Sequence, residues 1–237
     1  MRKNKDISFF YSLRVFLLVA QYSLLITFLA SCSSVRIKTS DLPVSEKTNT
    51  VASWYGPKFH GRPTSSGEIF NMYAMTCAHK EYPFGTRLKV TNMGNNRSAE
   101  CVVNDRGPFV KGRDIDLSYA VANEIGVIGP GMTSVLLETK GRDDSYIRPV
   151  KVQTSEMKGP FAIQVGAFTE SINAIQLKVA LRQKYANVYV QETEVNGENY
   201  YRVRVGNYQD YNTALSVAEK LGQEGYQALL LRADVEI

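Results

Sequence analysis

The sequence is poor in the residues that usually build metal and redox centres. Its 237 residues include only three Cys, two His and one Trp. A zinc site typically needs Cys or His ligands at short, regular spacings, and His60 and His79 do not complete such a pattern. We therefore expect neither a metal ion nor a cofactor.

The sequence also carries little excess charge beyond its first residues. The formal net charge is +5, and residues 1–31 contribute +3 of it through four basic residues against Asp6 alone. The remaining +2 is too small to support binding to a phosphate backbone. Nucleic acid is therefore not an expected partner.

No hydrophobic run is long enough to predict a transmembrane helix. Basic residues extend to Arg14, and two apolar runs follow at residues 15–20 and 24–29, separated by a polar break. A membrane span requires ~20 consecutive apolar residues. A basic segment, an apolar segment and then small residues predict a signal peptide over residues 1–31.

The end of that segment, Leu29-Ala30-Ser31-Cys32, resembles the lipobox of bacterial lipoproteins. The resemblance implies that Cys32 is acylated, and Ser33 after it implies sorting to the outer membrane. Several acyl chains give persistent anchoring, so we expect the protein on the periplasmic face of that membrane. Residues 32–49 show no regular period, which predicts a lipidated tether with a reach of about 23 Å.

Residues 50–140 have the pattern of a small β domain. Short alternating segments at 86–91, 98–103 and 134–138 are separated by turn signals, which predicts a barrel or sandwich. One amphipathic helix is expected from Ser118 to Ile125, with Asp116 or Ser118 as its cap and Gly126 as its end. The aperiodic interval 141–158 is interpreted as a linker.

Residues 159–235 have the pattern of an α+β domain. Strands are expected at 161–166, 187–195, 200–205 and 226–231, and helices at 170–184 and 210–221. The order is βαββαβ, and Asn196-Gly197 predicts a tight hairpin between the middle strands. A strand-Gly-x-aromatic pattern occurs twice, at 161–168 and 201–208, so the domain is an internal repeat.

Strand alternation in this second domain places three polar residues on one face of the sheet. If the neighbouring Ile and Val residues face the helices, Gln164, Arg202 and Arg204 line the open face. Their amide and guanidinium groups could bind sugar hydroxyls. An ordinary solvated sheet face is the alternative.

Residues suited to carbohydrate chemistry gather near turns of the first domain. Cleavage of a glycosidic bond needs an acid that protonates the leaving oxygen, usually with a second carboxylate. Asp105 and Glu68 are the candidate carboxylates, His79 lies in a nearby motif, and Trp54 and Tyr55 offer faces for sugar rings. A purely structural role is the alternative for Asp105 and Glu68, because carboxylates in turns commonly accept backbone hydrogen bonds.

The first domain resembles the rare lipoprotein A family over nearly its whole length. The resemblance rests on residues 52–56, 59–61, 64–68, 76–80, 83–86, 90–92, 103–109 and 116–118. It implies a six-stranded double-psi β-barrel that acts as a lytic transglycosylase on peptidoglycan. In that reaction the 6-hydroxyl of N-acetylmuramic acid attacks its own anomeric carbon, which leaves a 1,6-anhydro end.

The resemblance also implies roles for individual residues. Asp105 is expected to donate the proton, Glu68 to stabilise the oxocarbenium ion or assist deprotonation, and His79 to orient one carboxylate. Trp54 and Tyr55 are expected to stack on sugars, and Arg106 is a further expected substrate contact.

The second domain resembles the SPOR family through residues 161–168 and 201–206. Such domains bind glycan strands stripped of stem peptides, which implies a protein that cuts and holds denuded peptidoglycan at the division septum, with septal proteins as further partners. A non-catalytic wall-binding lipoprotein and a hydrolase are the alternatives, since both are compatible with the same residues.

Cys77 and Cys101 are the two thiols that remain after lipidation of Cys32. An oxidising periplasm would allow them to form a disulfide. Two buried small hydrophobic residues are the alternative, because the sequence does not give their Cα separation.

Overall fold

The computed structural model describes residues 47–153 and 158–233. The expected signal peptide over 1–31, the expected acylation site Cys32 and most of the expected tether lie outside these residues. Residues 47–49, expected at the end of the tether, instead begin the first strand. Within the described residues, no helix has the length and apolar character needed to span a membrane.

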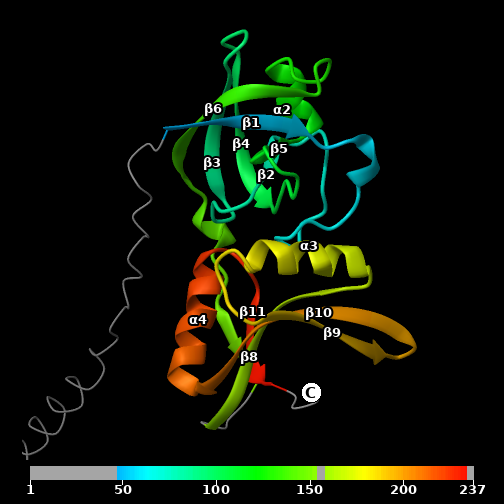
Figure 1. The fold of residues 1–237 in the computed structure, drawn as a ribbon, viewed down its shortest axis with the longest axis vertical. Helices are drawn as coiled ribbons and strands as arrows, with labels where there is room; N and C mark the ends of the chain where they lie inside the picture. The colour runs from blue at the N-terminus through cyan, green and yellow to red at the C-terminus, as the bar shows by residue number, and fades with distance from the viewer. Residues whose placement is uncertain (1–46, 154–157, 234–237) are drawn as a thin grey trace, which may run out of the picture. The chain divides into compact units, whose positions relative to one another are not determined.

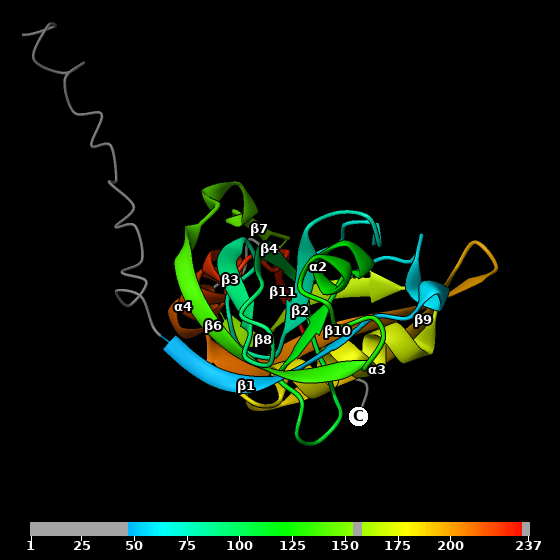
Figure 2. The ribbon, with the colours of Figure 1, turned by 90° about the horizontal axis from the view of Figure 1, so that it is seen from above.

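Six strands close into a barrel in the order β1-β5-β2-β4-β3-β6 (Figure 1). Their bounds are β1 Lys47–Trp54, β2 Thr76–His79, β3 Thr86–Asn92, β4 Ser98–Asp105, β5 Ile115–Leu117 and β6 Met132–Arg142. Two neighbouring pairs, β1 with β5 and β2 with β4, are parallel, and the others are antiparallel. Figure 2 shows β1, β3 and β6 curving around the barrel. The expected all-β barrel is confirmed.

Apolar side chains at alternate positions along the strands fill the barrel interior. Leu88 and Val90 of β3 and Val103 of β4 are fully buried, as the alternation predicts. Cys77 and Cys101 form a disulfide inside this core, with Cα atoms 5.9 Å apart. The expected helix is present as α2, Tyr119–Glu124, and Ser118 caps it by accepting the N–H of Val121.

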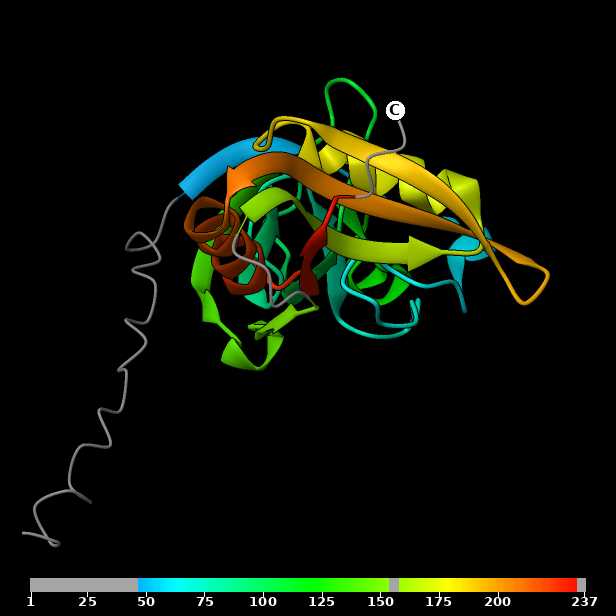
Figure 3. The same ribbon diagram turned by 90° about the horizontal axis from the view of Figure 1, so that it is seen from below.

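The second domain is a five-stranded sheet in the order β7-β11-β8-β10-β9. Its elements are β7 Val150–Val152, β8 Lys158–Phe168, α3 Ser171–Leu181, β9 Val188–Val195, β10 Glu198–Asp210, α4 Tyr211–Gln223 and β11 Ala228–Arg232. The expected βαββαβ order is confirmed, and Figure 3 shows the strands in front of the two helices. The interval expected as a linker contains β7, which pairs in parallel with β11 and widens the sheet.

The hairpin between β9 and β10 forms at the predicted position. Val195 pairs with Glu198, and Asn196 and Gly197 between them have φ angles of 53° and 81°. Positive φ at both central residues is the requirement of a type I′ turn, which Asn-Gly satisfies at low cost. This turn fixes the register of the two antiparallel strands.

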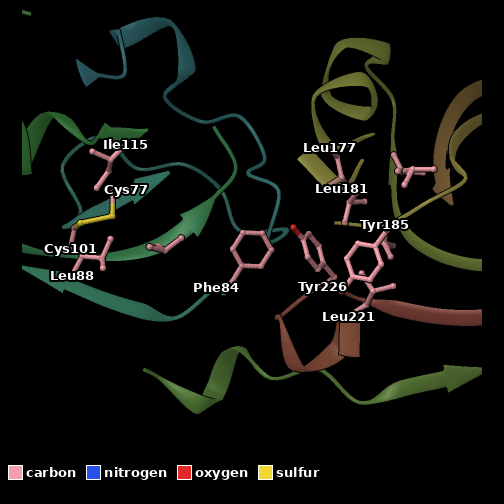
Figure 4. Packing of buried hydrophobic residues seen from close by; sticks show 14 of the residues in the cluster. Cys77, Phe84, Leu88, Cys101, Ile115, Leu177, Leu181, Tyr185, Leu221 and Tyr226 are labelled. Carbon is pink, nitrogen blue, oxygen red and sulfur yellow. A yellow bond between two sulfur atoms is a disulfide. The ribbon is translucent and has the colours of Figure 1, made fainter. Parts of the chain in front are cut away.

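Buried side chains join the barrel to the second domain. Phe84, which is fully buried, packs edge-on against Tyr226 with ring centroids 5.0 Å apart (Figure 4). The N–H of Phe84 donates to the carbonyl of Glu224, and the N–H of Arg148 donates to the carbonyl of Gly222. The described parts of both domains therefore belong to one compact unit with one continuous core.

Candidate functional site

A cavity of about 530 Å³ lies where β1, β4 and β5 approach one another. Asp105, the last residue of β4, and Asp116, the middle residue of β5, both line it. Each stands opposite Ala78 of β2, the strand between them. Two strand spacings place their Cα atoms roughly 10 Å apart. The barrel therefore presents two carboxylates to one cavity.

The carboxylate of Asp105 accepts three hydrogen bonds. The hydroxyl of Tyr55 donates to Oδ2 at 2.9 Å, and the N–H groups of Ser65 and Arg106 donate to Oδ1 at 2.8 and 2.7 Å. Burial, and then the negative charges of Asp105 and Asp116, raise the pKa of Tyr55 well above its usual 10. Tyr55 therefore stays protonated and remains a donor. Such a set of donors orients both oxygens of a carboxylate.

Asp116 is in a different environment. Its carboxylate accepts a hydrogen bond from the hydroxyl of Ser53, the residue beside it on β1. Burial raises the pKa of Asp116 above its usual 3.8, and the charge of Asp105 acts in the same direction. The hydrogen bond from Ser53 and the charge of Arg113 partly offset this effect. The environments of the two Asp residues therefore differ, as in known pairs of an acid and a base.

Glu68 supports this site without lining the cavity. A bulge leaves two residues of β4, Asn104 and Asp105, opposite the single residue Ala78. Glu68 accepts a hydrogen bond from Nδ2 of Asn104 at 2.7 Å, and the hydroxyl of Tyr146 also bonds to it. Its carboxylate is thus attached to the bulge that sets the direction of Asp105.

His79 is likewise outside the set of residues that line the cavity. Its Nδ1 accepts the N–H groups of Glu81 and Tyr82, both at 3.1 Å, and its ring packs on that of Tyr82. Burial, followed by the charge of Arg106, lowers the pKa of His79 to about 3. The neutral imidazole therefore holds the turn that follows β2, and within the described residues no hydrogen bond joins it to a carboxylate.

Arg106 is among the residues that line the cavity, but its side chain is buried in the domain junction. It is only 4% exposed, and its guanidinium lies 3.7 Å from the centroid of the Phe84 ring. Its Nε donates to the hydroxyl of Tyr226 at 2.5 Å, and its Nη1 donates to the carbonyl of Tyr82 at 3.0 Å. The side chain expected to bind substrate thus connects the residue after Asp105 to the second domain.

Aromatic residues form part of the cavity wall. Trp54 and Tyr55 line it as expected, but the Tyr55 ring is also packed between Phe59 and Phe70. Phe59 and Phe109 add two exposed rings that the sequence analysis did not select. The opposite wall comes from the second domain and includes three residues of α3: Ile172, Asn173 and Gln176.

The three polar residues expected on the open face of the second sheet differ in their exposure to solvent. Gln164 is half-buried and pairs with Arg204 across the strands. Arg204 is only 3% exposed, so its side chain is covered and does not stand on an open face. Arg202 is half-buried and lines none of the cavities described here.

Asp116 was expected only as an alternative helix cap within the motif at residues 116–118, and the sequence indicated no catalytic role for it. Its signal was a single carboxylate between two apolar residues, Ile115 and Leu117, in a short strand. Both apolar residues are fully buried, which leaves Asp116 pointing out of the barrel core. Among residues 47–153 and 158–233, no cluster of three or more His, Cys, Asp or Glu could hold a metal ion.

Two family profiles match the chain. One, described as lytic transglycolase, matches residues 47–137, and the other, described as SPOR domain, matches residues 158–232. A Vibrio cholerae protein named endolytic peptidoglycan transglycosylase RlpA is 38% identical over 182 residues, which are 76% of this chain and 67% of that protein. The chain belongs to the RlpA family. The family expected from the motifs is thereby confirmed.

Other RlpA proteins are longer than the matched region. A Helicobacter pylori strain J99 protein of the same name is 38% identical over 199 residues, and the match covers 76% of this chain and 63% of that protein. The chain thus spans less than two thirds of that relative. The crystal structure of the RlpA SPOR domain from Pseudomonas aeruginosa is 26% identical, with a TM-score of 0.28 and coverage of 31% of this chain and 99% of that one.

Proposed function

We propose that this RlpA protein is a lytic transglycosylase that cuts the glycan strands of peptidoglycan. Its preferred substrate is a strand without stem peptides, and its product ends in 1,6-anhydro-N-acetylmuramic acid. The observation that carries the proposal is the pair Asp105 and Asp116, two carboxylates of different environment in one cavity with aromatic walls. The names of the relatives point to the same reaction.

The two carboxylates divide the chemistry between them. Burial raises the pKa of Asp116 and so favours its protonated form more than in an ordinary Asp, and in the proposal this residue donates its proton to the leaving glycosidic oxygen. The resulting Asp116 carboxylate then takes the proton of the 6-hydroxyl as that oxygen bonds to the anomeric carbon. Asp105, fixed by its three donors, stabilises the positive charge that develops on the ring.

This assignment moves the proton donor from Asp105, where the sequence analysis put it, to Asp116. Glu68 and His79 become positioning residues in the proposal. Glu68 acts through Asn104 at the bulge, and His79 acts through the turn whose carbonyl groups accept from Arg106. Trp54 and the exposed rings of Phe59 and Phe109 are proposed to stack on sugars.

The second domain is proposed to hold the same polymer. A binding module joined to a catalytic module raises the local concentration of substrate. The lipobox at Leu29–Cys32 supports anchoring of the chain to the outer membrane. We further propose that the protein is enriched at the division septum, where septal proteins are its partners.

Mass analysis of products tests the proposal. Peptide-free glycan strands are incubated with the chain from residue 33 onward, and with Asp105→Asn and Asp116→Asn variants. We expect anhydro-ended fragments from the parent and a loss of roughly a hundred-fold or more in each variant. Reducing ends would identify a hydrolase. An absence of fragments from a folded chain that binds glycan would favour the non-catalytic wall-binding alternative.

A further inference from the structure

A second cavity of about 530 Å³ adjoins the candidate active site. Thr64, Ser65 and Phe168 line both cavities, so the two are contiguous. Ser65 is also the residue whose N–H donates to Asp105. A polymer cut in the first cavity can therefore continue into the second.

This second cavity is bounded by both domains. The barrel contributes the loop at residues 64–67, and the second domain contributes the ends of β8 and β11 and the stretch from Arg148 to Lys151. Lys151, Leu229 and Gln164 stand in register across β7, β11 and β8. Side chains in register across neighbouring strands share one face of a sheet. Lys151 and Gln164 thus stand on one face, two strand spacings or roughly 10 Å apart.

The charged side chains that line the cavity are both basic. Arg148 and Lys151 are the charged residues among those that line it, and no Asp or Glu joins them. Nε of Arg148 is buried and donates to no partner among the described residues. A buried donor on a charged group is costly when it is left unpaired. This geometry favours an anionic ligand that reaches Arg148.

The other polar groups of the cavity suit a sugar. Ser65 contributes a half-buried hydroxyl group, and Gln164 and Gln227 contribute side-chain amides, whereas the buried hydroxyl groups of Thr64 and Ser66 bond to each other. Such groups both donate and accept, as sugar hydroxyl and acetamido groups do. The site therefore combines two cations with neutral groups that match a saccharide. A carboxylate on a sugar satisfies both parts.

We infer that this cavity binds the glycan strand next to the cut and recognises the free lactyl carboxylate of N-acetylmuramic acid through Arg148 and Lys151. The inference rests on the proposed function, because that function supplies the polymer. On a denuded strand each lactyl group ends in a carboxylate. On a strand with stem peptides the same carbon forms an amide, which carries no charge. Arg148 and Lys151 are thus determinants of the preference for denuded strands.

Arg148 is the more specific of the two contacts. Its planar guanidinium can bind a carboxylate with two parallel hydrogen bonds, whereas the ammonium of Lys151 acts as a point charge. Lys151 is exposed and Arg148 is half-buried, so the screening by salt is weaker at Arg148. Replacement of Arg148 by Lys would retain the charge and lose the paired geometry.

Binding measurements with two matched ligands test the inference. One ligand is a peptide-free glycan oligosaccharide, and the other is the same oligosaccharide with its lactyl carboxylates converted to methylamides. The proteins carry Asp105→Asn to prevent turnover, with or without Arg148→Gln and Lys151→Gln. A control pair, Arg87→Gln and Lys89→Gln, removes equal charge from β3, outside both cavities.

We expect the Asp105→Asn parent and the control pair to bind the acidic ligand at least roughly ten-fold more tightly than the methylamide. The Arg148 and Lys151 variant loses this ratio while it keeps the affinity for the methylamide, which also shows that it is folded. Arg148→Lys gives an intermediate ratio. A ratio that persists in the double variant, or no ratio in the parent, overturns the inference.

The same proteins without Asp105→Asn separate the inference from the proposed function. Anhydro ends without any charge preference would leave the function in place and overturn the role of the cavity. Charge-dependent binding without cleavage would support the cavity as a binding site and contradict the proposed activity.

Discussion

Asp105 and Asp116 stand opposite the same residue, Ala78, on the two strands that flank β2. Ala78 is fully buried, so the two carboxylates lie on either side of a strand that is fixed in the barrel core. The disulfide between Cys77 and Cys101 joins β2 to β4 directly beside this point. The separation of the two acids is therefore set by the barrel itself and not by a loop.

The raised pKa of Asp116 predicts a pH dependence of activity that the hydroxyl of Ser53 influences. If Asp116 acts as the acid, kcat/KM falls as the pH rises through its raised pKa. The hydrogen bond from Ser53 lowers that pKa, so Ser53→Ala raises it further. We expect the alkaline limb of the pH–rate profile to move to higher pH in Ser53→Ala. Ser98→Ala, at a half-buried Ser of β4 outside both cavities, serves as the control. A limb that stays in place or moves down would argue against Asp116 as the acid.

Tyr55→Phe tests the support of Asp105. The substitution removes the hydroxyl that donates to Oδ2 and retains the ring between Phe59 and Phe70. A hydrogen bond to a charged group contributes about 1.5–3 kcal/mol, so we expect kcat to fall roughly ten-fold or more. Tyr73→Phe, at an exposed ring, provides the matched control. Equal activity of the two variants would show that Asp105 does not depend on Tyr55.

The lowered pKa of His79 predicts that the free energy of unfolding falls as the pH is lowered through a defined range. The pKa of His79 is about 3 in the folded chain and about 6.5 when it is unfolded. A lowered folded pKa gives stability that is fully present above pH 6.5 and is lost as the pH falls toward 3. The loss from this group is at most about 1.4 kcal/mol per pH unit.

Urea unfolding at several pH values measures this dependence. His79→Asn retains an acceptor for the N–H groups of Glu81 and Tyr82 and removes the titration, so the slope in the window becomes shallower. His60→Asn, at an exposed His, retains the slope. An unchanged slope in His79→Asn would assign the acid sensitivity to other groups.

Tyr226→Phe tests the junction between the domains. The change keeps the ring against Phe84 but removes the acceptor for Nε of Arg106. Because Arg106 is buried, we expect a loss of about 1–3 kcal/mol in the free energy of unfolding. Tyr208→Phe, at a half-buried ring, is expected to stay within about 0.5 kcal/mol of the parent. Equal stability of the two variants would mean that the Arg106–Tyr226 bond contributes nothing.

Much of the fold follows from local patterns in the sequence. The turn at Asn196-Gly197, the Ser118 cap and the alternation along β3 each depend on residues that are near one another in the chain. The proximity of Asp105 and Asp116 does not, because it requires β2 to insert between β4 and β5. The bulge at Asn104 also reverses the direction that simple alternation along β4 would predict for Asp105.

The contacts of Arg106 could likewise not be predicted from the sequence, because its partners Phe84 and Tyr226 lie in different domains. Short β7 was missed since three residues are too few to show a period. These differences are all consequences of pairings between distant segments.

The most direct test of the account is cleavage of peptide-free glycan strands in water labelled with heavy oxygen. A lytic transglycosylase closes the anhydro ring with the sugar's own 6-hydroxyl, so the account predicts fragments that contain no label. Hydrolysis would place a labelled oxygen on each new reducing end. Labelled fragments from the parent chain, absent in Asp116→Asn, would contradict the central claim and identify water as the nucleophile.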